Sequence, residues 1–250
     1  MSDYEQPTRE PVFNIPGVVV ALLAIFAAIQ AIRDALLSPQ QDLWVILTFA
    51  FIPIRYAMPV GSEPLPGGLG ADLWTFLTYG FLHGGWLHLI VNAVWMLAFG
   101  SAVARRFGTA RFLAFSALAT IGGAALHLAL HFGEPVPVVG ASAAISGQMA
   151  AAARFVFEPG APLGGWRRAA PDWAYRRPAT SLAGVVRNRQ AMSFLGIWFG
   201  LNILFGVFNL PLLGGGGEGG IAWEAHIGGF LVGLVLFPLF DPVGVQREPA

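Results

Sequence analysis

Long apolar stretches dominate the chain and determine its expected architecture. A helix needs about 20 apolar residues to cross the hydrocarbon core of a bilayer, and six stretches come close to that length. They cover residues 15–32, 85–104, 112–132, 138–157, 194–213 and 221–240. The pattern predicts an all-α polytopic membrane protein with six transmembrane helices and, over residues 1–250, a single membrane domain.

Two further segments lie between these stretches. Residues 43–54 are apolar but too short to span, and Pro53, Arg55 and Pro59 end the run. We expect an interfacial or re-entrant helix there, in the first loop. Residues 158–190 are rich in Pro, Gly and Arg, and we expect them to form a flexible, basic cytoplasmic loop against anionic headgroups.

Composition supports the membrane assignment and argues against several kinds of function. Hydrophobic residues make up 56% of the 250 residues and charged residues 11%, whereas soluble domains usually carry about 25% charged residues. The formal net charge is zero, which argues against a nucleic-acid partner. The chain has no cysteine for a disulfide or a thiolate metal site. Its first eleven residues are polar and partly acidic, unlike a cleavable signal peptide, so the first stretch should remain as a span.

The distribution of arginine predicts the orientation. All 14 basic residues are arginine. Apart from Arg154, near the end of the fourth stretch, only Arg33 and Arg55 fall outside the two tails and the loops that follow the second and fourth stretches. Loops rich in arginine stay in the cytoplasm. Both termini are therefore expected to be cytoplasmic.

A few polar side chains lie inside the apolar stretches, where each is costly unless it has a partner or a function. His88 and Asn92 lie near the start of the second stretch, Ser142 near the start of the fourth and His226 near the start of the sixth. With the N-terminus inside, all three stretches begin at the outer face, so these side chains share one depth. Histidine is the usual base for a serine nucleophile. His88, Asn92 and the Ser142 amide could donate to an oxyanion.

Small residues share helix faces with the candidate nucleophile and base. Ser142 begins a face of serine and alanine in the fourth stretch, and Gly229 and Gly233 share a face with His226 in the sixth. Small faces allow two helix backbones to approach closely. We therefore expect these helices to bring Ser142 and His226 within hydrogen-bond distance.

Three motifs in combination resemble the rhomboid family of intramembrane proteases. The motifs are His83-x4-His88-x3-Asn92, Gly140-Ala141-Ser142 and Ala225-His226-Ile227-Gly228-Gly229-x3-Gly233. The resemblance covers about residues 72–240. It implies a six-helix rhomboid-like bundle with a catalytic Ser142–His226 dyad. The oxyanion hole would consist of His88, Asn92 and the Ser142 amide, with Gly140, His83, Gly229 and Gly233 as structural residues near the site.

The function implied by this resemblance is that of a serine endopeptidase. Its substrates would be membrane proteins with a helix-destabilised, small-residue transmembrane segment, cleaved near the outer face. Its partners would be those substrates and the lipid bilayer. No cofactor and no nucleic acid is expected, and the oligomeric state is unknown. A bacterial inner membrane would be the simplest location for this short six-span form.

The sequence departs from the family pattern at four places. Ala143 follows the serine where glycine is common, and Ser146 replaces an aromatic residue that packs on the catalytic histidine. The arginine that often follows Trp74 is absent, and Ala104 replaces a glutamate. The replacement at Ser146 affects how His226 is positioned. The replacements after Trp74 and at Ala104 affect stability or loop anchoring more than chemistry.

Two other classes of function stay open. An inactive relative that binds transmembrane clients would share the fold, although loss of Ser142 or His226 would have indicated it, and both are present. A small transporter is the other class, but the chain lacks the two related halves with broken helices that this class predicts.

Metal binding is the remaining alternative. His83, His88 and His226 could hold a metal, but no H-E-x-x-H motif or carboxylate cluster accompanies them. We therefore expect no metal site and no inhibition by chelators. His127 and His131 are spaced i, i+4 and could in principle ligate a metal, but they are expected to be interfacial residues at the end of the third stretch.

Glu224 precedes the candidate base by two residues. Side chains at i and i+2 point apart on a helix. We therefore expect Glu224 to be solvated at the outer rim rather than to serve as a third catalytic residue.

Overall fold

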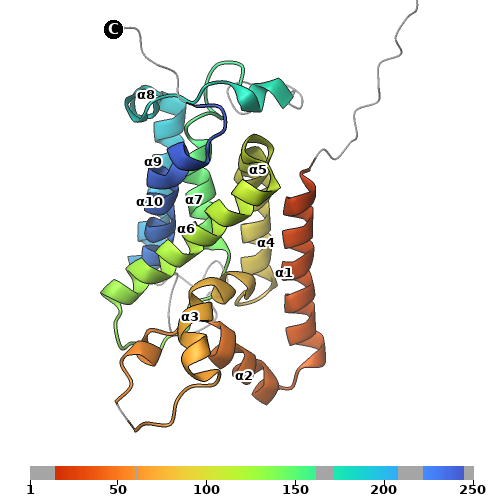
Figure 1. Ribbon diagram of the computed structural model, residues 1–250, viewed down its shortest axis with the longest axis vertical. Helices are drawn as coiled ribbons and strands as arrows, with labels where there is room; N and C mark the ends of the chain where they lie inside the picture. Colours follow the sequence, from red (N-terminus) through yellow and green to blue (C-terminus); the bar gives the residue numbers. More distant parts are fainter. Residues whose placement is uncertain (1–14, 60, 162–171, 208–221, 245–250) are drawn as a thin grey trace, which may run out of the picture.

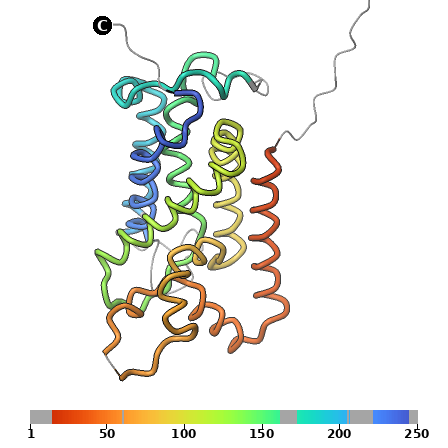
Figure 2. Tube along the Cα trace, viewed as in Figure 1, coloured from red at the N-terminus to blue at the C-terminus, as the bar shows by residue number. Residues whose placement is uncertain are grey.

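The described part of the chain is helical (Figures 1 and 2). The computed structural model describes residues 15–59, 61–161, 172–207 and 222–244. Four helices in these ranges are long and apolar enough to cross a membrane. They are α1 (Gly17–Leu36), the run Trp86–Phe107, α6 (Thr109–Leu130) and α10 (Trp223–Phe240). A helical membrane bundle is thus confirmed, with the first described helix beginning and the last one ending at the same end (Figure 1).

The second predicted stretch forms one continuous but irregular helix. It consists of α4 (Trp86–Trp95), a π-helical turn, η3 (Met96–Gly100), and α5 (Ser101–Phe107). A methyl group on Gly100 would lie 2.8 Å from the Gln148 side-chain oxygen. The widened turn therefore lies where the run meets a polar side chain of α7 (Ser142–Ala152).

The fourth predicted stretch, residues 138–157, is helical over a shorter length than expected. α7 has 11 residues, which corresponds to about 17 Å, roughly half of the hydrocarbon core. Val138 pairs with Phe51 in an isolated bridge, and Gly140 has a φ of +124°, so the chain cannot be helical before Ser142. Every residue from Ala143 to Ala152 is buried. Neighbouring helices enclose α7, so it needs no bilayer-spanning length of its own.

The fifth predicted stretch coincides only partly with a described helix. α9 (Arg189–Val207) begins before residue 194. Residues 208–213 of the prediction lie outside the described residues, as does residue 221 at the start of the sixth stretch. A bundle of six spanning helices therefore stays a prediction.

The first loop contains more helix than the apolar run predicted. Its elements are α2 (Pro39–Phe49), the 3₁₀ turns η1 (Pro53–Tyr56) and η2 (Tyr79–Phe81), and α3 (Gly68–Thr78). α2 begins before residue 43 because Ser38, directly before Pro39, forms a capping box with Gln41 in the first turn. Arg33 of α1 forms an ion pair with Asp42 of α2, with 2.7 Å between Nε and Oδ1. These elements lie at the lower end of the bundle in Figure 1.

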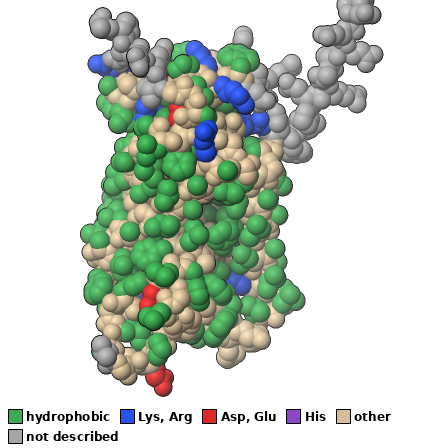
Figure 3. Space-filling model, viewed as in Figure 1, with side chains coloured by type: hydrophobic (Ala, Val, Ile, Leu, Met, Phe, Trp, Pro, Cys, Tyr) green, Lys and Arg blue, Asp and Glu red, His purple; other side chains and the backbone are tan. Residues whose placement is uncertain are grey.

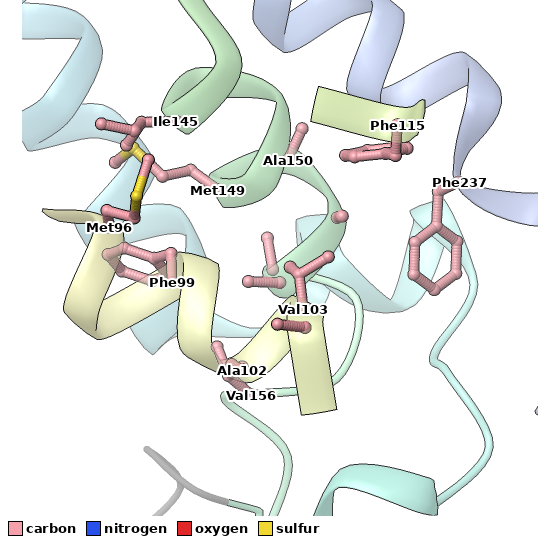
Figure 4. Packing of buried hydrophobic residues seen from close by; sticks show 14 of the residues in the cluster. Met96, Phe99, Ala102, Val103, Phe115, Ile145, Met149, Ala150, Val156 and Phe237 are labelled. Carbon is pink, nitrogen blue, oxygen red and sulfur yellow. The ribbon is translucent and has the colours of Figure 1, made fainter. Parts of the chain in front are cut away.

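α7 forms the centre of the bundle and contacts its neighbours in two different ways. Towards the π-helical turn η3 it packs apolar side chains, with Ile145 and Met149 near Met96 and Phe99 (Figure 4). Towards α6 and α10 it packs nearly backbone to backbone. A methyl group on Gly147 would lie 2.6 Å from the Ala119 Cβ of α6 and 3.0 Å from the Gly229 carbonyl of α10.

The opposite end of the bundle is held by buried arginines. Arg106 of α5 forms a two-point ion pair with Asp241, which follows α10, at 2.7 and 2.9 Å. Arg106 also donates to the carbonyls of Tyr175 and Arg177. Arg154 donates to the Thr180 carbonyl at 2.7 Å. These bonds fix the described part of the 158–190 segment, which contains η4 (Asp172–Arg176) and α8 (Leu182–Arg187), onto the bundle.

Side-chain character changes along the bundle. On the face shown in Figure 3, the middle is largely apolar and blue basic side chains gather at the end that bears α8. This distribution suits a protein whose middle lies in lipid and whose basic end contacts headgroups.

Candidate active site

Ser142 and His226 lie together at the contact between α7 and α10. Ser142 is the first residue of α7, and His226 lies in the first turn of α10. The Ser142 Oγ is 2.7 Å from the His226 Nε2. Both side chains are only partly buried. The chain thus brings a hydroxyl and an imidazole, 84 positions apart in sequence, into hydrogen-bond contact near the start of two helices.

Asn202 of α9 contacts the other ring nitrogen of His226. The Asn202 Oδ1 hydrogen-bonds with the His226 Nδ1, and the Asn202 Nδ2 donates to the Trp198 carbonyl at 2.8 Å. Because the amide nitrogen is already engaged, the amide oxygen faces the ring. The His226 Nδ1 therefore carries the proton, which leaves the Nε2 lone pair for the Ser142 hydroxyl.

Asn202 is not among the site residues that the sequence predicted. A signal was present, because an amide inside an apolar stretch is costly without a partner. The three family motifs lie in the second, fourth and sixth stretches, whereas Asn202 lies in the fifth. Here α9 supplies the side chain that orients His226.

His88 and Asn92 line the space beside the loop that precedes Ser142. A methyl group on Gly140 would lie 2.8 Å from the His88 Nε2 and 3.6 Å from the Asn92 Nδ2. The Gly140 N–H donates to the Tyr79 carbonyl at 3.0 Å, which holds this loop in place. Glycine is therefore needed twice at this position, for its positive φ and for the close approach of the two side chains.

Both side chains have donors available. The Gly84 N–H donates to the His88 Nδ1 at 3.3 Å, so a neutral His88 carries its proton on Nε2, the atom nearest to Gly140. Asn92 is 5% exposed, and its Nδ2 has no hydrogen-bond partner among the described residues. A buried amide donor without a partner costs free energy, which suits a group that bonds a transient oxyanion.

His83 is a supporting residue next to this cluster. It is 1% exposed, its ring centroid is 5.3 Å from that of His88, and Arg33 donates to its carbonyl at 2.7 Å. Burial, together with the nearby His88 and Arg33, lowers the pKa of His83 below its ordinary value. A neutral His83 therefore packs against His88 without adding charge to the site.

Gly229 and Gly233 lie where α10 meets the backbone of α7. A methyl group on Gly229 would overlap the Ala143 carbonyl. One on Gly233 would lie 2.5 Å from the Gly147 Cα. The two glycines therefore allow the short distance between the helices that carry Ser142 and His226.

Ser146 does not contact the His226 ring in the way that an aromatic residue would. Its Oγ donates to the Ser142 carbonyl at 2.7 Å, within α7. The side chain that holds His226 instead comes from Asn202.

The prediction that Glu224 is solvated at the outer rim is wrong. Glu224 is 7% exposed, and its carboxylate lies 3.0 Å from the His131 Nε2 and 3.7 Å from the His127 Nδ1. The helical argument that it points away from His226 holds, but the direction opposite to His226 leads to α6 rather than to solvent. His127 is likewise buried, at 6% exposed, in the last turn of α6.

Comparison with known proteins identifies the family to which this arrangement belongs. A family model described as the Rhomboid domain matches residues 70–240, which is more than half of the chain. A curated protein named "RHOMBOID-like protein 5", from Arabidopsis thaliana, is 29% identical in an alignment 150 residues long, which covers 55% of this chain and 48% of that protein. The chain therefore spans about half the length of this relative. With its helical bundle and its Ser, His and Asn motifs inside the matched region, the chain belongs to the rhomboid family.

Proposed function

We propose that this protein is an intramembrane serine endopeptidase in which Ser142 is the nucleophile and His226 is the base. The observation that carries the proposal is the 2.7 Å distance between the Ser142 Oγ and the His226 Nε2. In the first step the hydroxyl oxygen attacks the carbonyl carbon of the scissile peptide, and its proton passes to the His226 Nε2. The imidazolium then gives that proton to the leaving amine, and water hydrolyses the acyl-enzyme.

Asn202 would keep His226 in the productive tautomer during these steps. As the Nε2 gains a proton, the Nδ1–H stays bonded to the Asn202 Oδ1. A neutral amide orients the ring and stabilises the imidazolium through its dipole, whereas a carboxylate would do so through a full charge.

The oxyanion would be stabilised by the His88 Nε2–H, the Asn92 Nδ2–H and the Ser142 N–H. The Asn92 donor is buried and without a partner in the described structure. The Ser142 amide belongs to the first turn of α7, where N–H groups have no intrahelical acceptor. Donors fixed in place before the reaction are the main source of such stabilisation.

The substrates would be membrane proteins whose transmembrane segment unfolds readily into the site. The site lies near the start of α7 and α10, so cleavage would occur near one face of the membrane. The arginine distribution favours cytoplasmic termini, which makes this the outer face. A bacterial inner membrane is the location that fits the short six-span form.

The test is labelling and cleavage by the purified protein in detergent. A fluorophosphonate should label the wild type and not Ser142→Ala, and the wild type should cut a transmembrane substrate near one end of its apolar segment. Ser146→Ala is the matched control, because Ser146 lies one turn along the same helix with its hydroxyl bonded to the backbone. It should keep the label.

Two results would contradict the proposal. Cleavage by Ser142→Ala at the wild-type rate would exclude the mechanism. A folded wild type that neither takes the label nor cuts any substrate would favour an inactive family member that binds transmembrane clients.

A further inference from the structure

A second cluster of ionisable side chains joins α6 to α10, on the side of α10 that faces away from Ser142. His127 and His131 lie one turn apart at the end of α6, with ring centroids 4.4 Å apart and nearly parallel. Glu224 faces them from the first turn of α10. One ligand atom from each of the three residues lies within 4.8 Å of the other two. We propose that His127, His131 and Glu224 bind a zinc ion that clamps α6 to α10.

The donor atoms suit zinc in kind and in spacing. Two imidazole nitrogens and one carboxylate oxygen form a set that Zn²⁺ accepts, with water in the fourth position, whereas Ca²⁺ and Mg²⁺ prefer oxygen ligands. The Glu224 carboxylate already lies 3.0 Å from the His131 Nε2 and 3.7 Å from the His127 Nδ1. Ligand atoms of a tetrahedral zinc site lie about 3.3 Å apart, whereas the three ligand atoms here lie within 4.8 Å of one another, so the side chains would draw together when the ion binds.

His127 gives the observation that favours a ligand over an ordinary polar network. It is 6% exposed, and its Nδ1, which faces Glu224, makes no hydrogen bond among the described residues. A buried nitrogen without a hydrogen bond costs free energy unless something bonds to it. A metal ion between this nitrogen and the carboxylate would remove that cost.

Glu134 completes the arrangement outside the three ligands. Its Oε2 lies 3.0 Å from the His131 Nδ1, the ring nitrogen opposite the one that faces Glu224. Histidine ligands of metals commonly place their second ring nitrogen against a carboxylate, which fixes the ring and strengthens it as a ligand. The His131 side chain is 26% exposed and that of Glu134 52%, which leaves an entry path from solvent.

The clamp is separate from the proposed proteolytic chemistry. Glu224 and His226 point to opposite sides of α10, so the ion would hold the start of that helix against α6 without touching Ser142 or His226. Ser142→Ala should accordingly bind zinc as the wild type does. Failure of the zinc site and failure of the proteolytic proposal can therefore be told apart.

The experiment measures Zn²⁺ binding to the purified full chain in detergent, carrying no histidine tag, by competition with a fluorescent chelator. The wild type should bind one zinc ion, and saturating zinc should raise the melting temperature by about 5 °C. The double variant His127→Ala/His131→Ala should bind at least about 100-fold more weakly. Glu134→Gln should weaken binding about tenfold, as expected for a residue that supports a ligand. His83→Ala, which removes a buried histidine elsewhere, is the matched control and should bind normally.

Spectroscopy of the wild type keeps the test decisive if a variant does not fold. Zinc X-ray absorption should report two imidazole ligands, because the cluster contains two histidines. Three imidazoles would instead indicate His83, His88 and His226 and would overturn the assignment. No saturable binding by the wild type, or unchanged binding by the double variant, would also overturn it.

Discussion

The two faces of α10 place opposite demands on its sequence. On the inward face, Gly229 and Gly233 carry no side chain because the backbone of α7 occupies that space. On the outward face, Val235 and Leu239 are 70% and 79% exposed and contact little of the protein. Lipid tails are as apolar as leucine, so the outward side chains contribute little to helix association. The position of His226 therefore depends on glycines, whose lack of a side chain lets α10 approach α7, rather than on apolar burial.

The largest effect is expected when the imidazole of His226 is removed. His226→Ala should lower cleavage by at least about 10⁴-fold, as loss of a member of such a catalytic set does. Val235→Ala, which removes side-chain atoms from the outward face of the same helix, should cleave at close to the wild-type rate. Cleavage time courses on a transmembrane substrate measure both. Comparable losses in the two variants would mean that damage to α10, and not the imidazole, explains the effect.

Filling the inward face should have the next largest effect. The branched side chain of Gly233→Val would collide with Gly147, because a Cβ on residue 233 would lie 2.5 Å from the Gly147 Cα. Misplacement of reacting groups by about an ångström can by itself cost about 100-fold in rate, and the collision would add to this loss by destabilising the contact between α7 and α10. We expect loss of cleavage together with a lower melting temperature, measured on the same preparation.

Val235→Leu is the matched control, since it also enlarges a side chain of α10 but on the exposed face. It should change neither quantity appreciably. Wild-type cleavage by Gly233→Val would show that the contact between α7 and α10 does not determine the Ser142–His226 distance.

Loss of a proposed oxyanion donor should have the next largest effect on the rate of cleavage. Asn92→Ala and His88→Ala each remove one proposed oxyanion donor, which typically costs about 2.7–4 kcal/mol of transition-state stabilisation. The loss should appear in kcat with little change in KM, and remaining donors can soften either single change. A double variant with full turnover would contradict the assignment.

Asn202 should give the smallest of these losses, because it acts through His226. Asn202→Leu removes the acceptor for the Nδ1–H and should lower kcat about tenfold, a fraction of what a general base contributes, with KM nearly unchanged. Asn202→Asp keeps an oxygen acceptor and should retain more turnover than Asn202→Leu. Equal losses in both variants would indicate a packing role for Asn202 instead.

The sequence was most informative where function and topology constrain it together. His88, Asn92, Ser142 and His226 were selected because their stretches all begin at one face, and the structure has them at one end of the bundle. Their spacing along each helix and the cost of polar groups in lipid are local properties that can be read from a single chain.

The sequence was less informative where tertiary contacts decide. Apolar character extends over residues 138–157, but the helix starts only at Ser142, because the backbone of Gly140 and the Phe51–Val138 bridge set its first residue. The side chain of Glu224 could be assigned to the face away from His226. That this face meets His127 and His131 depends on how α6 crosses α10, which no local pattern records.

The ion pair between Arg106 and Asp241 has a consequence for biosynthesis. Both side chains are almost fully buried, at 0% and 1% exposed, and a buried charge without its partner costs about 3–5 kcal/mol. Asp241 follows α10, and α10 also carries His226. The ribosome therefore makes the Asp241 carboxylate and the His226 imidazole after every other described helix. Until α10 has entered the membrane, Arg106 has no carboxylate partner and Ser142 has no base. On the proposed mechanism, a partly synthesised chain that still lacks α10 is thus unable to cut its neighbours.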